Sequence, residues 1–214
     1  MTVEIELKYQ LSANNDGNDG NDVVADDISA MLSAQNISFE IKCHQLTNDY
    51  YDTDNLALRA MDFGLRIRTV ADRYEQTIKT AGKVEGCLHQ RPEYNVDIAD
   101  NSLKLALFPK SIWPQNTNVE ALEKQLQVIF STNFFRQIWL IHQDDSIIEL
   151  ALDRGEITTS AKAPKLAINE LEIELVNGNK EALFILAEQL GTIVKMTPGK
   201  LSKAARGYSL YHAR

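Results

Sequence analysis

Charged residues recur at every second position in several segments of this sequence. One such segment is Glu4-Ile5-Glu6-Leu7-Lys8, and another is Glu170-Leu171-Glu172-Ile173-Glu174. Side chains two positions apart in a β-strand point to the same face and lie about 7 Å apart. Carboxylates held that close repel one another, and a divalent cation would relieve the repulsion. Because Mg²⁺ takes oxygen ligands, the spacing indicates a site for such an ion.

Basic residues lie in comparable positions elsewhere in the chain. They are Lys8, Arg66, Arg68, Lys79, Arg91 and Arg136. Arginine can bind phosphate oxygens with two hydrogen bonds at once, whereas lysine acts as a point charge. Acids that hold a metal, together with bases that hold phosphate, describe a polyphosphate site better than either group does alone.

The elements that position these side chains are expected to be mostly extended, because apolar and polar residues alternate along much of the chain. The expected strands are Val3–Leu11, Ile37–Leu46, Asn48–Asp52, Leu65–Val70, Tyr74–Thr80, Leu88–Val96, Phe134–Gln143, Ser146–Asp153, Gly155–Ala161 and Leu166–Val176. Pro92 interrupts one of them early, which indicates a sheet edge or a bulge. Asp144-Asp145 and Asn177-Gly178 are expected turns.

Helical spacing of apolar residues is confined to a few segments. The expected helices are Val24–Ala34, Asn101–Phe108, Val119–Phe130, Lys180–Leu190 and Leu201–Ala205, and Gly191 is expected to stop the fourth of them. The Asn- and Gly-rich stretch 14–22 is expected to be a flexible loop insertion. Strands and helices do not alternate, which argues against a doubly wound sheet and favours an antiparallel sheet or barrel.

Two interpretations fit the charged faces of these strands. In an ordinary open sheet the charged faces would point to solvent, and for any one strand alone this is the better interpretation. In the alternative, apolar faces pack outward under helices and charged faces line the interior of a closed barrel, which at eight strands can hold one small ligand. The clustering of like charges favours the second, so we expect an α+β, mainly antiparallel, eight-stranded closed β-barrel with a charged interior and helices packed outside.

The composition narrows the class of partner. Lys plus Arg total 22 and Asp plus Glu total 30, which gives a formal net charge of −8. An acidic chain is a poor candidate for general nucleic-acid binding. The N-terminus resembles no targeting segment, and no apolar run approaches the roughly 20 residues of a membrane span. We therefore expect a cytoplasmic protein that acts on a small molecule and binds neither nucleic acid nor membrane; its oligomeric state stays open.

The charged segments, taken in order, resemble the CYTH superfamily, also called triphosphate tunnel metalloenzymes. The segments that carry the resemblance are Glu4-Ile5-Glu6-Leu7-Lys8 (its ExExK signature), Tyr50-Tyr51-Asp52-Thr53, Gly64-Leu65-Arg66-Ile67-Arg68, Thr77-Ile78-Lys79, Arg91-Pro92-Glu93, Glu149 to Asp153, Glu170-Leu171-Glu172 and Ser202 to Tyr208. They cover nearly the whole chain. The TIKTAG segment (Thr77 to Gly82) and the terminal SKAARGY segment look most similar to the inorganic triphosphatase branch.

The resemblance implies a tunnel-forming barrel and a hydrolase that cleaves inorganic triphosphate to pyrophosphate and phosphate with Mg²⁺ or Mn²⁺. The metal ligands that it implies are Glu4, Glu6, Asp153, Glu170 and Glu172. The residues that it implies bind substrate are Lys8, Arg66, Arg68, Lys79, Arg91, Arg136 and Lys203, the last from a C-terminal helix near one mouth. The residues that it implies take part in catalysis are Glu170, Glu172, Lys8 and Glu93.

The chain departs from the family pattern at the loop insertion 14–22 and at Asn95, and several functions stay open. Asn95 stands where a third alternating acid is found in the family, so it receives no metal role. We expect one domain over residues 1–214, without the C-terminal CHAD domain of some relatives. Thiamine triphosphatase and class IV adenylate cyclase activity are the enzyme alternatives. A module that binds polyphosphate or nucleotide without cleaving it, and a purely structural barrel, are the non-enzyme alternatives.

Overall fold

The computed structural model describes residues 1–12, 23–159 and 164–213. The expected loop over 14–22 and the last residues of the expected strand Gly155–Ala161 lie outside the described residues. The strands are β1 (Thr2–Leu11), β2 (Ser38–Asp52), β3 (Gly64–Val70), β4 (Arg73–Lys79), β5 (Lys83–Glu85), β6 (Leu88–Ile98), β7 (Gln127–Gln143), β8 (Ser146–Thr158), β9 (Leu166–Asn177) and β10 (Met196–Pro198). The α-helices are α1 (Val23–Ala34), α2 (Ala57–Ala60), α3 (Val119–Glu123), α4 (Glu181–Ile193) and α5 (Lys203–His212).

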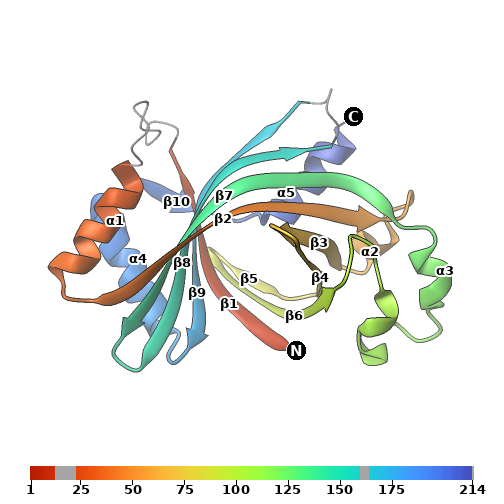
Figure 1. The fold of residues 1–214 in the computed structure, drawn as a ribbon, viewed down its shortest axis with the longest axis horizontal. Helices are drawn as coiled ribbons and strands as arrows, with labels where there is room; N and C mark the ends of the chain where they lie inside the picture. Colours follow the sequence, from red (N-terminus) through yellow and green to blue (C-terminus); the bar gives the residue numbers. More distant parts are fainter. Residues whose placement is uncertain (13–22, 160–163, 214) are drawn as a thin grey trace.

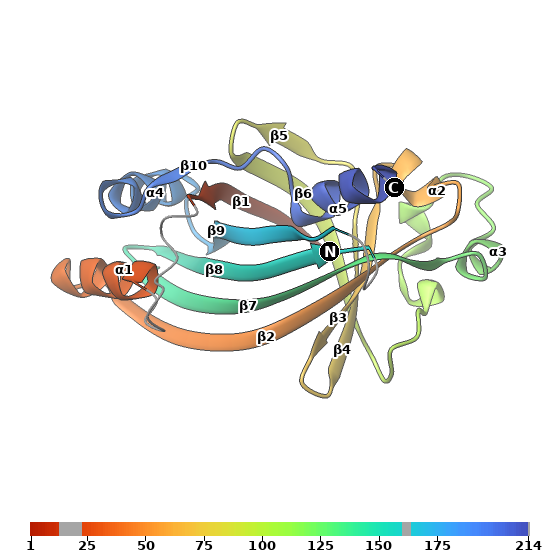
Figure 2. The same ribbon diagram turned by 90° about the horizontal axis from the view of Figure 1, so that it is seen from above.

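Eight of these strands form a closed antiparallel barrel, as expected. The hydrogen-bonded order runs β10-β1-β9-β8-β7-β2-β3-β4-β6-β5, and β1 also pairs with β6, which closes the sheet. The first part of β1 pairs with β6 from Thr2 to Leu7, and its later part pairs with β9 from Glu6 to Gln10. The short strands β5 and β10 extend β6 and β1 outside the closed ring. Figures 1 and 2 show long β2 and β7 crossing the whole molecule side by side.

Two apolar cores pack against the outer face of the barrel at opposite ends (Figure 1). At one end, α1 and α4 cover the odd-numbered residues of β7 and β9 and the even-numbered residues of β8, such as Trp139, Leu150 and Leu171. At the other end, α2, α3 and two 3₁₀ turns (Leu105–Leu107 and Lys110–Ile112) cover Leu65 and Ile78. Burial of these apolar faces leaves the alternate, charged faces of the same strands pointing into the barrel.

Helix α5 closes one end of the barrel interior. Its Tyr208 packs with Phe130 and Phe134 of β7, which belong to the same face as Arg136, and with Ile168 of β9. Gly207 makes this approach possible, because a Cβ there would lie 2.2 Å from the Phe130 ring. The expected C-terminal helix thus exists but begins at Lys203 and runs to His212, beyond the expected end at Ala205. None of the described helices is long and apolar enough to cross a membrane.

The expected helix Val119–Phe130 is wrong beyond its first turn. Only Val119–Glu123 is helical, and strand β7 begins at Gln127. Apolar residues at helical spacing continue into β7, but Phe130 pairs with Tyr50 of β2 and its ring stacks on the Tyr50 ring with centroids 4.5 Å apart. This long-range pairing decides the conformation, because local spacing in a short apolar stretch fits strand and helix equally.

Smaller differences have similar causes. The expected helix Asn101–Phe108 is reduced to a 3₁₀ turn, and α4 runs through Gly191 to Ile193. β6 is continuous through Pro92. This residue lies where the partner of β6 changes from β4 to β5, so the N–H that proline lacks is not needed for a hydrogen bond between strands. β8 likewise continues through Gly155, which lies against the backbone of β7 so closely that a Cβ would meet Asn133 O at 2.1 Å.

The close packing of α5 on β7 makes Gly207 a test of the fold. We expect Gly207→Ala to lower the free energy of unfolding by about 1–3 kcal/mol, because the added methyl group overlaps the Phe130 ring. Gly191→Ala in α4 is the matched control: its Cβ would meet nothing nearer than 3.8 Å, and we expect a gain of about 0.5–1 kcal/mol. Urea denaturation of both variants measures the difference. Equal stability of the two variants would contradict this packing.

Candidate active site

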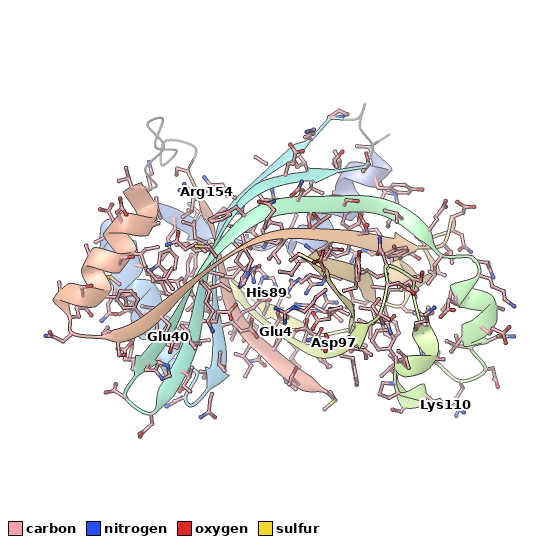
Figure 3. The ribbon with its side chains drawn as sticks, in the orientation of Figure 1. Glu4, Glu40, His89, Asp97, Lys110 and Arg154 are labelled. Carbon is pink, nitrogen blue, oxygen red and sulfur yellow. The ribbon has the colours of Figure 1, made fainter. Side chains whose placement is uncertain are left out.

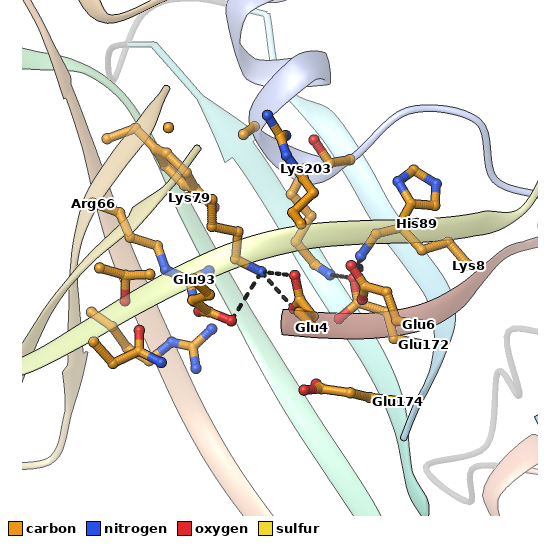
Figure 4. A pocket seen from close by; sticks show the side chains of 18 of the residues that line it. Glu4, Glu6, Lys8, Arg66, Lys79, His89, Glu93, Glu172, Glu174 and Lys203 are labelled. Carbon is orange, nitrogen blue, oxygen red and sulfur yellow. Dashed lines mark hydrogen bonds and ion pairs between the residues drawn. The ribbon is translucent and has the colours of Figure 1, made fainter. Parts of the chain in front are cut away.

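The barrel encloses a cavity of about 300 Å³ whose wall is mostly charged. That volume lies at the lower end of the range for small-molecule sites. All eight barrel strands and α5 contribute to the wall (Figure 4). The charged residues that line it are Glu4, Glu6, Lys8, Arg66, Arg68, Glu75, Lys79, Arg91, Glu93, Arg136, Glu149, Glu172, Glu174 and Lys203. Figure 3 shows Glu4 and His89 inside the barrel, with Glu40 and Lys110 toward the two ends of the molecule.

The structure therefore brings nearly all the expected site residues to one cavity. Glu4, Arg68 and Glu172, which an open sheet would have exposed to solvent, lie on three different strands around it. Asp153 and Glu170 are the exceptions: they do not line the cavity and are buried behind it, at 0% and 1% exposure.

Lys203 of α5 holds these two buried acids. Its Nζ lies 2.6 Å from Asp153 Oδ2, 2.5 Å from Glu170 Oε1 and 3.0 Å from Glu172 Oε1. The oxygens of these three carboxylates lie within 4.8 Å of one another. Arg136 adds a second cation, since its Nε and Nη2 donate to the two oxygens of Asp153 at 2.7 and 2.6 Å. The cluster that most resembles a metal site by geometry is thus already neutralised by side chains.

Lys8 and Glu172 form the centre of the charged wall. Lys8 Nζ donates to Glu172 at 2.5 Å and to Glu6 at 2.7 Å, and Arg136 donates to the other oxygen of Glu172 at 2.5 Å. Burial disfavours charge on Lys8, but Glu172 and Glu6 outweigh it and raise the Lys8 pKa well above its usual value. Burial likewise opposes ionisation of Glu172, but Lys203, Lys8 and Arg136 hold its pKa well below the usual range.

A second group of charges lies along β4 and β6. Lys79 Nζ donates to both oxygens of Glu4 at 2.6 Å and lies 3.6 Å from Glu93. Arg66 approaches the other oxygen of Glu93 at 3.7 Å. Within the described part of the chain, Glu93 has no closer partner, so both its oxygens stay available as hydrogen-bond acceptors.

Arg68 is an excess positive charge in this wall. Its Nε donates to Asn48 Oδ1 at 3.0 Å, and among the described residues no carboxylate forms an ion pair with it. Burial, together with repulsion from Arg66 and Arg136, lowers the pKa of Arg68 to about 10. A half-buried guanidinium among like charges favours an anion at this end of the cavity.

Arg91 lies at the edge of the cavity and is largely engaged by the protein itself. Its Nε donates to Thr80 O at 3.0 Å, and its Nη2 donates to the backbone and side-chain oxygens of Asp62 at 3.1 Å. It also packs over Gly82, where a Cβ would lie 2.4 Å from its Cγ. Arg91 therefore ties two loops to the wall as well as offering charge to the cavity.

Three acidic wall residues and one histidine received no site role from the sequence, namely Glu75, Glu149, Glu174 and His89. Glu174 is directly opposite Glu6 on β1 and Glu149 on β8, and burial together with repulsion from Glu4 and Glu6 raises its pKa to about 8. Its even spacing with Glu170 and Glu172 was the available signal. His89 is buried and its Nε2 lies 3.1 Å from Gly199 O, in the segment that leads into α5. Spacing gave no signal for that contact.

Helix α5 is held in place at both ends. Ser202 caps it by accepting a hydrogen bond from Ala205 N at 3.1 Å, and Arg206 donates to Glu170 at 3.0 Å. Further along, the Tyr208 hydroxyl donates at 2.8 Å to Asp52, which is fully buried. These bonds fix Lys203 at the end of the cavity.

The chemistry of the wall fits a divalent cation of the Mg²⁺ class. Such ions take carboxylate oxygens and keep sites for water and phosphate oxygens. Glu4, Glu6 and Glu172 line the cavity, and Glu174 adds a carboxylate for which the described residues offer no ion-pair partner. Asp153 and Glu170 fit less directly, because Lys203 already lies between them.

Comparison with known proteins places this arrangement in a family. The model of the CYTH domain matches residues 3–208. A curated protein from Haemophilus influenzae, named inorganic triphosphatase, is 36% identical over 218 residues, covering 98% of this chain and 55% of that protein. The chain thus spans about half the length of this relative.

Solved structures with the same fold include proteins of different kinds. A Hippeastrum protein, described as a putative adenylyl cyclase with a dominant triphosphatase activity, matches with a TM-score of 0.64 at 18% identity, covering 96% of this chain and 95% of that chain. The triphosphatase of a Mimivirus capping enzyme matches with a TM-score of 0.52 at 13% identity, covering 91% of this chain and 90% of that chain. A chain of the Schizosaccharomyces pombe Mediator head module matches with a TM-score of 0.53 at 10% identity, covering 94% of this chain and 100% of that chain. At such identities the likeness shows the fold alone.

The buried cluster around Arg136 gives a stability prediction. We expect Asp153→Asn to lower the free energy of unfolding by roughly 3 kcal/mol, because Arg136 and Lys203 lose a fully buried counter-charge. Glu149→Gln is the control on the same strand, because Glu149 is partly exposed and its carboxylate comes no nearer to Arg136 than 3.8 Å. We expect this variant to lower the free energy of unfolding by less than about 1 kcal/mol. Chemical denaturation measures both. A similar loss in the two variants would argue against a special role for the buried pair.

Proposed function

The chain belongs to the CYTH domain family, and we propose that it is a metal-dependent hydrolase that cleaves inorganic triphosphate to pyrophosphate and phosphate. We propose Mg²⁺ or Mn²⁺ as its cation, the cytoplasm as its compartment and a free small-molecule triphosphate, not nucleic acid, as its substrate. The 36% identical relative named inorganic triphosphatase supports the choice of substrate.

One observation carries the proposal. The cavity inside the barrel holds groups that lack a partner of opposite charge. Among the described residues Arg68 has no carboxylate partner, and Glu174 has no basic one, so that burial and repulsion from Glu4 and Glu6 raise its pKa to about 8. A metal bound to a polyphosphate carries both signs of charge and would satisfy both. A purely structural barrel gains nothing from such unpaired charges, because burying them costs free energy.

The basic residues of the wall would bind and orient the substrate. Arg66, Arg68 and Arg136 lie on β3 and β7, so their guanidiniums can contact phosphate oxygens from two sides. Lys8, Lys79, Arg91 and Lys203 would add positive charge that stabilises the transferring phosphoryl group and the leaving pyrophosphate.

The acidic residues would hold the cation and handle the water proton. We assign the cation to Glu4, Glu6 and Glu172, with Glu174 beside them and with Asp153 and Glu170 supporting them through Lys203. When bound, such an ion polarises phosphoryl oxygens and lowers the pKa of water. Glu93 is our candidate to accept the proton of that water, because its carboxylate stays more than 3.5 Å from Lys79 and Arg66.

A substrate assay tests the proposal. Purified protein with Mg²⁺ or Mn²⁺ is expected to release phosphate from inorganic triphosphate, to lose this activity in EDTA and to regain it with excess cation. We expect Glu6→Gln and Arg68→Ala each to lower kcat/KM about 100-fold or more, the range for loss of one group that stabilises transition-state charge. Thiamine triphosphate and ATP, assayed for phosphate, pyrophosphate and cyclic nucleotide separately, test the two alternative activities.

Two results would overturn the assignment. Full activity in both variants would remove these residues from the site. Binding of triphosphate without any turnover, with either cation, would favour a module that captures polyphosphate and does not cleave it.

A further inference from the structure

The lysines of the cavity are paired with the carboxylates to which we assign the cation. Lys8 contacts Glu6 and Glu172, and Lys79 contacts Glu4. Under the proposed function these lysines bind phosphate and these glutamates bind metal. Neither partner of such a pair can serve its ligand fully while it holds the other, so ligand binding must exchange ion pairs inside the barrel.

The pair between Lys79 and Glu4 is the one best placed to exchange. The two residues lie on β4 and β1, which are separated by β6, so the pair spans the wall and does not link strand neighbours. Figure 4 shows the ammonium of Lys79 beside the carboxylate of Glu4, with dashed lines to both of its oxygens and to Glu93. The Lys79 side chain is 22% exposed, whereas those of Lys8 and Lys203 are 7% and 8% exposed. Of the three, Lys79 therefore moves at the lowest cost.

We propose that Lys79 neutralises Glu4 in the empty barrel and transfers to a phosphate of the substrate when a divalent cation takes Glu4. The inference rests on the proposed function and deepens it, because it makes the binding of cation and triphosphate cooperative. Either ligand alone must break the pair and leaves one charge without a partner in a buried site. The two together break it once and supply a new partner to each charge.

The size of the effect follows from the burial of the pair. Separation of a buried ion pair leaves an uncompensated charge and is far more costly than separation of an exposed pair. A coupling between two ligands is reciprocal, so each ligand raises the affinity of the other by the same factor. Factors of about 5 to 150 are typical for such coupling. Removal of one partner should therefore release the other for its own ligand, which a lysine that serves phosphate alone would not do.

Calorimetric titration of metal-free protein with Mn²⁺ alone tests the first half of the exchange. We expect Lys79→Met to bind Mn²⁺ about tenfold more tightly than the unsubstituted protein, because the competitor for Glu4 is gone. Arg68→Met is the matched control: it removes a positive charge from the same cavity, but one that no described carboxylate pairs with, and we expect a change of less than about twofold. Unchanged affinity in Lys79→Met, or an equal gain in both variants, would overturn the proposal.

Titration with inorganic triphosphate in EDTA tests the second half. We expect Glu4→Gln to bind metal-free triphosphate about tenfold more tightly, because Lys79 is then released to contact a phosphate. The same variant should lose turnover, because Glu4 is assigned to the cation. Glu75→Gln, which removes a wall carboxylate that forms no ion pair among the described residues, is the control and should change this affinity by less than about twofold. No gain in Glu4→Gln would refute the exchange.

These titrations separate this inference from the proposed function. Neither requires turnover, so hydrolysis with unchanged affinities would overturn the exchange alone, and exchange without hydrolysis would overturn the hydrolase alone. Lys79→Met leaves Glu4 buried without its partner, so a thermal unfolding curve accompanies each titration. If that variant does not fold, the double variant Glu4→Gln/Lys79→Met replaces it. The exchange then predicts that the double variant loses the tenfold gain in triphosphate affinity of Glu4→Gln, and persistence of the gain would contradict it.

Discussion

A charged side chain inside a closed barrel needs a partner of opposite charge, because water is largely excluded and burial of a lone ion is costly. This constraint governs the whole interior of the protein. Glu172 accepts bonds from Lys8, Arg136 and Lys203, which come from β1, β7 and α5. Three elements far apart in the chain are thus held by one carboxylate, while the outer apolar residues of β1 and β7 pack under α1 and α4.

Cavity residues that lack a partner of opposite charge indicate what kind of ligand the barrel binds. Arg68 lies among like charges at one part of the cavity wall, and Glu174 lies among like charges at another. The two imbalances have opposite sign within one cavity, which is the pattern that a metal-bound polyphosphate would neutralise. The same logic makes Asp153 a supporting residue, since Arg136 and Lys203 already satisfy it.

The contribution of α5 is the part of the site that sequence reasoning described least well. The terminal motif identified Lys203, but not the bonds that place it: the cap by Ser202, the pair between Arg206 and Glu170, and the hydroxyl of Tyr208 on buried Asp52. The last two join residues far apart in the chain, whereas the cap joins Ser202 to Ala205, three positions later. Long-range pairing of the same kind turned the expected helix over Ile129 and Phe130 into strand.

By itself, the sequence determined which face of each strand carries charge, because side chains alternate with a period of two whatever the strand pairs with. That was enough to predict a closed barrel with a charged interior and to name most residues of its wall. Only the tertiary structure decided which charges meet. The pairing of Lys79 with Glu4, of Arg91 with Asp62 and of Lys203 with the buried acids depends on strand order and barrel closure, which no local pattern encodes.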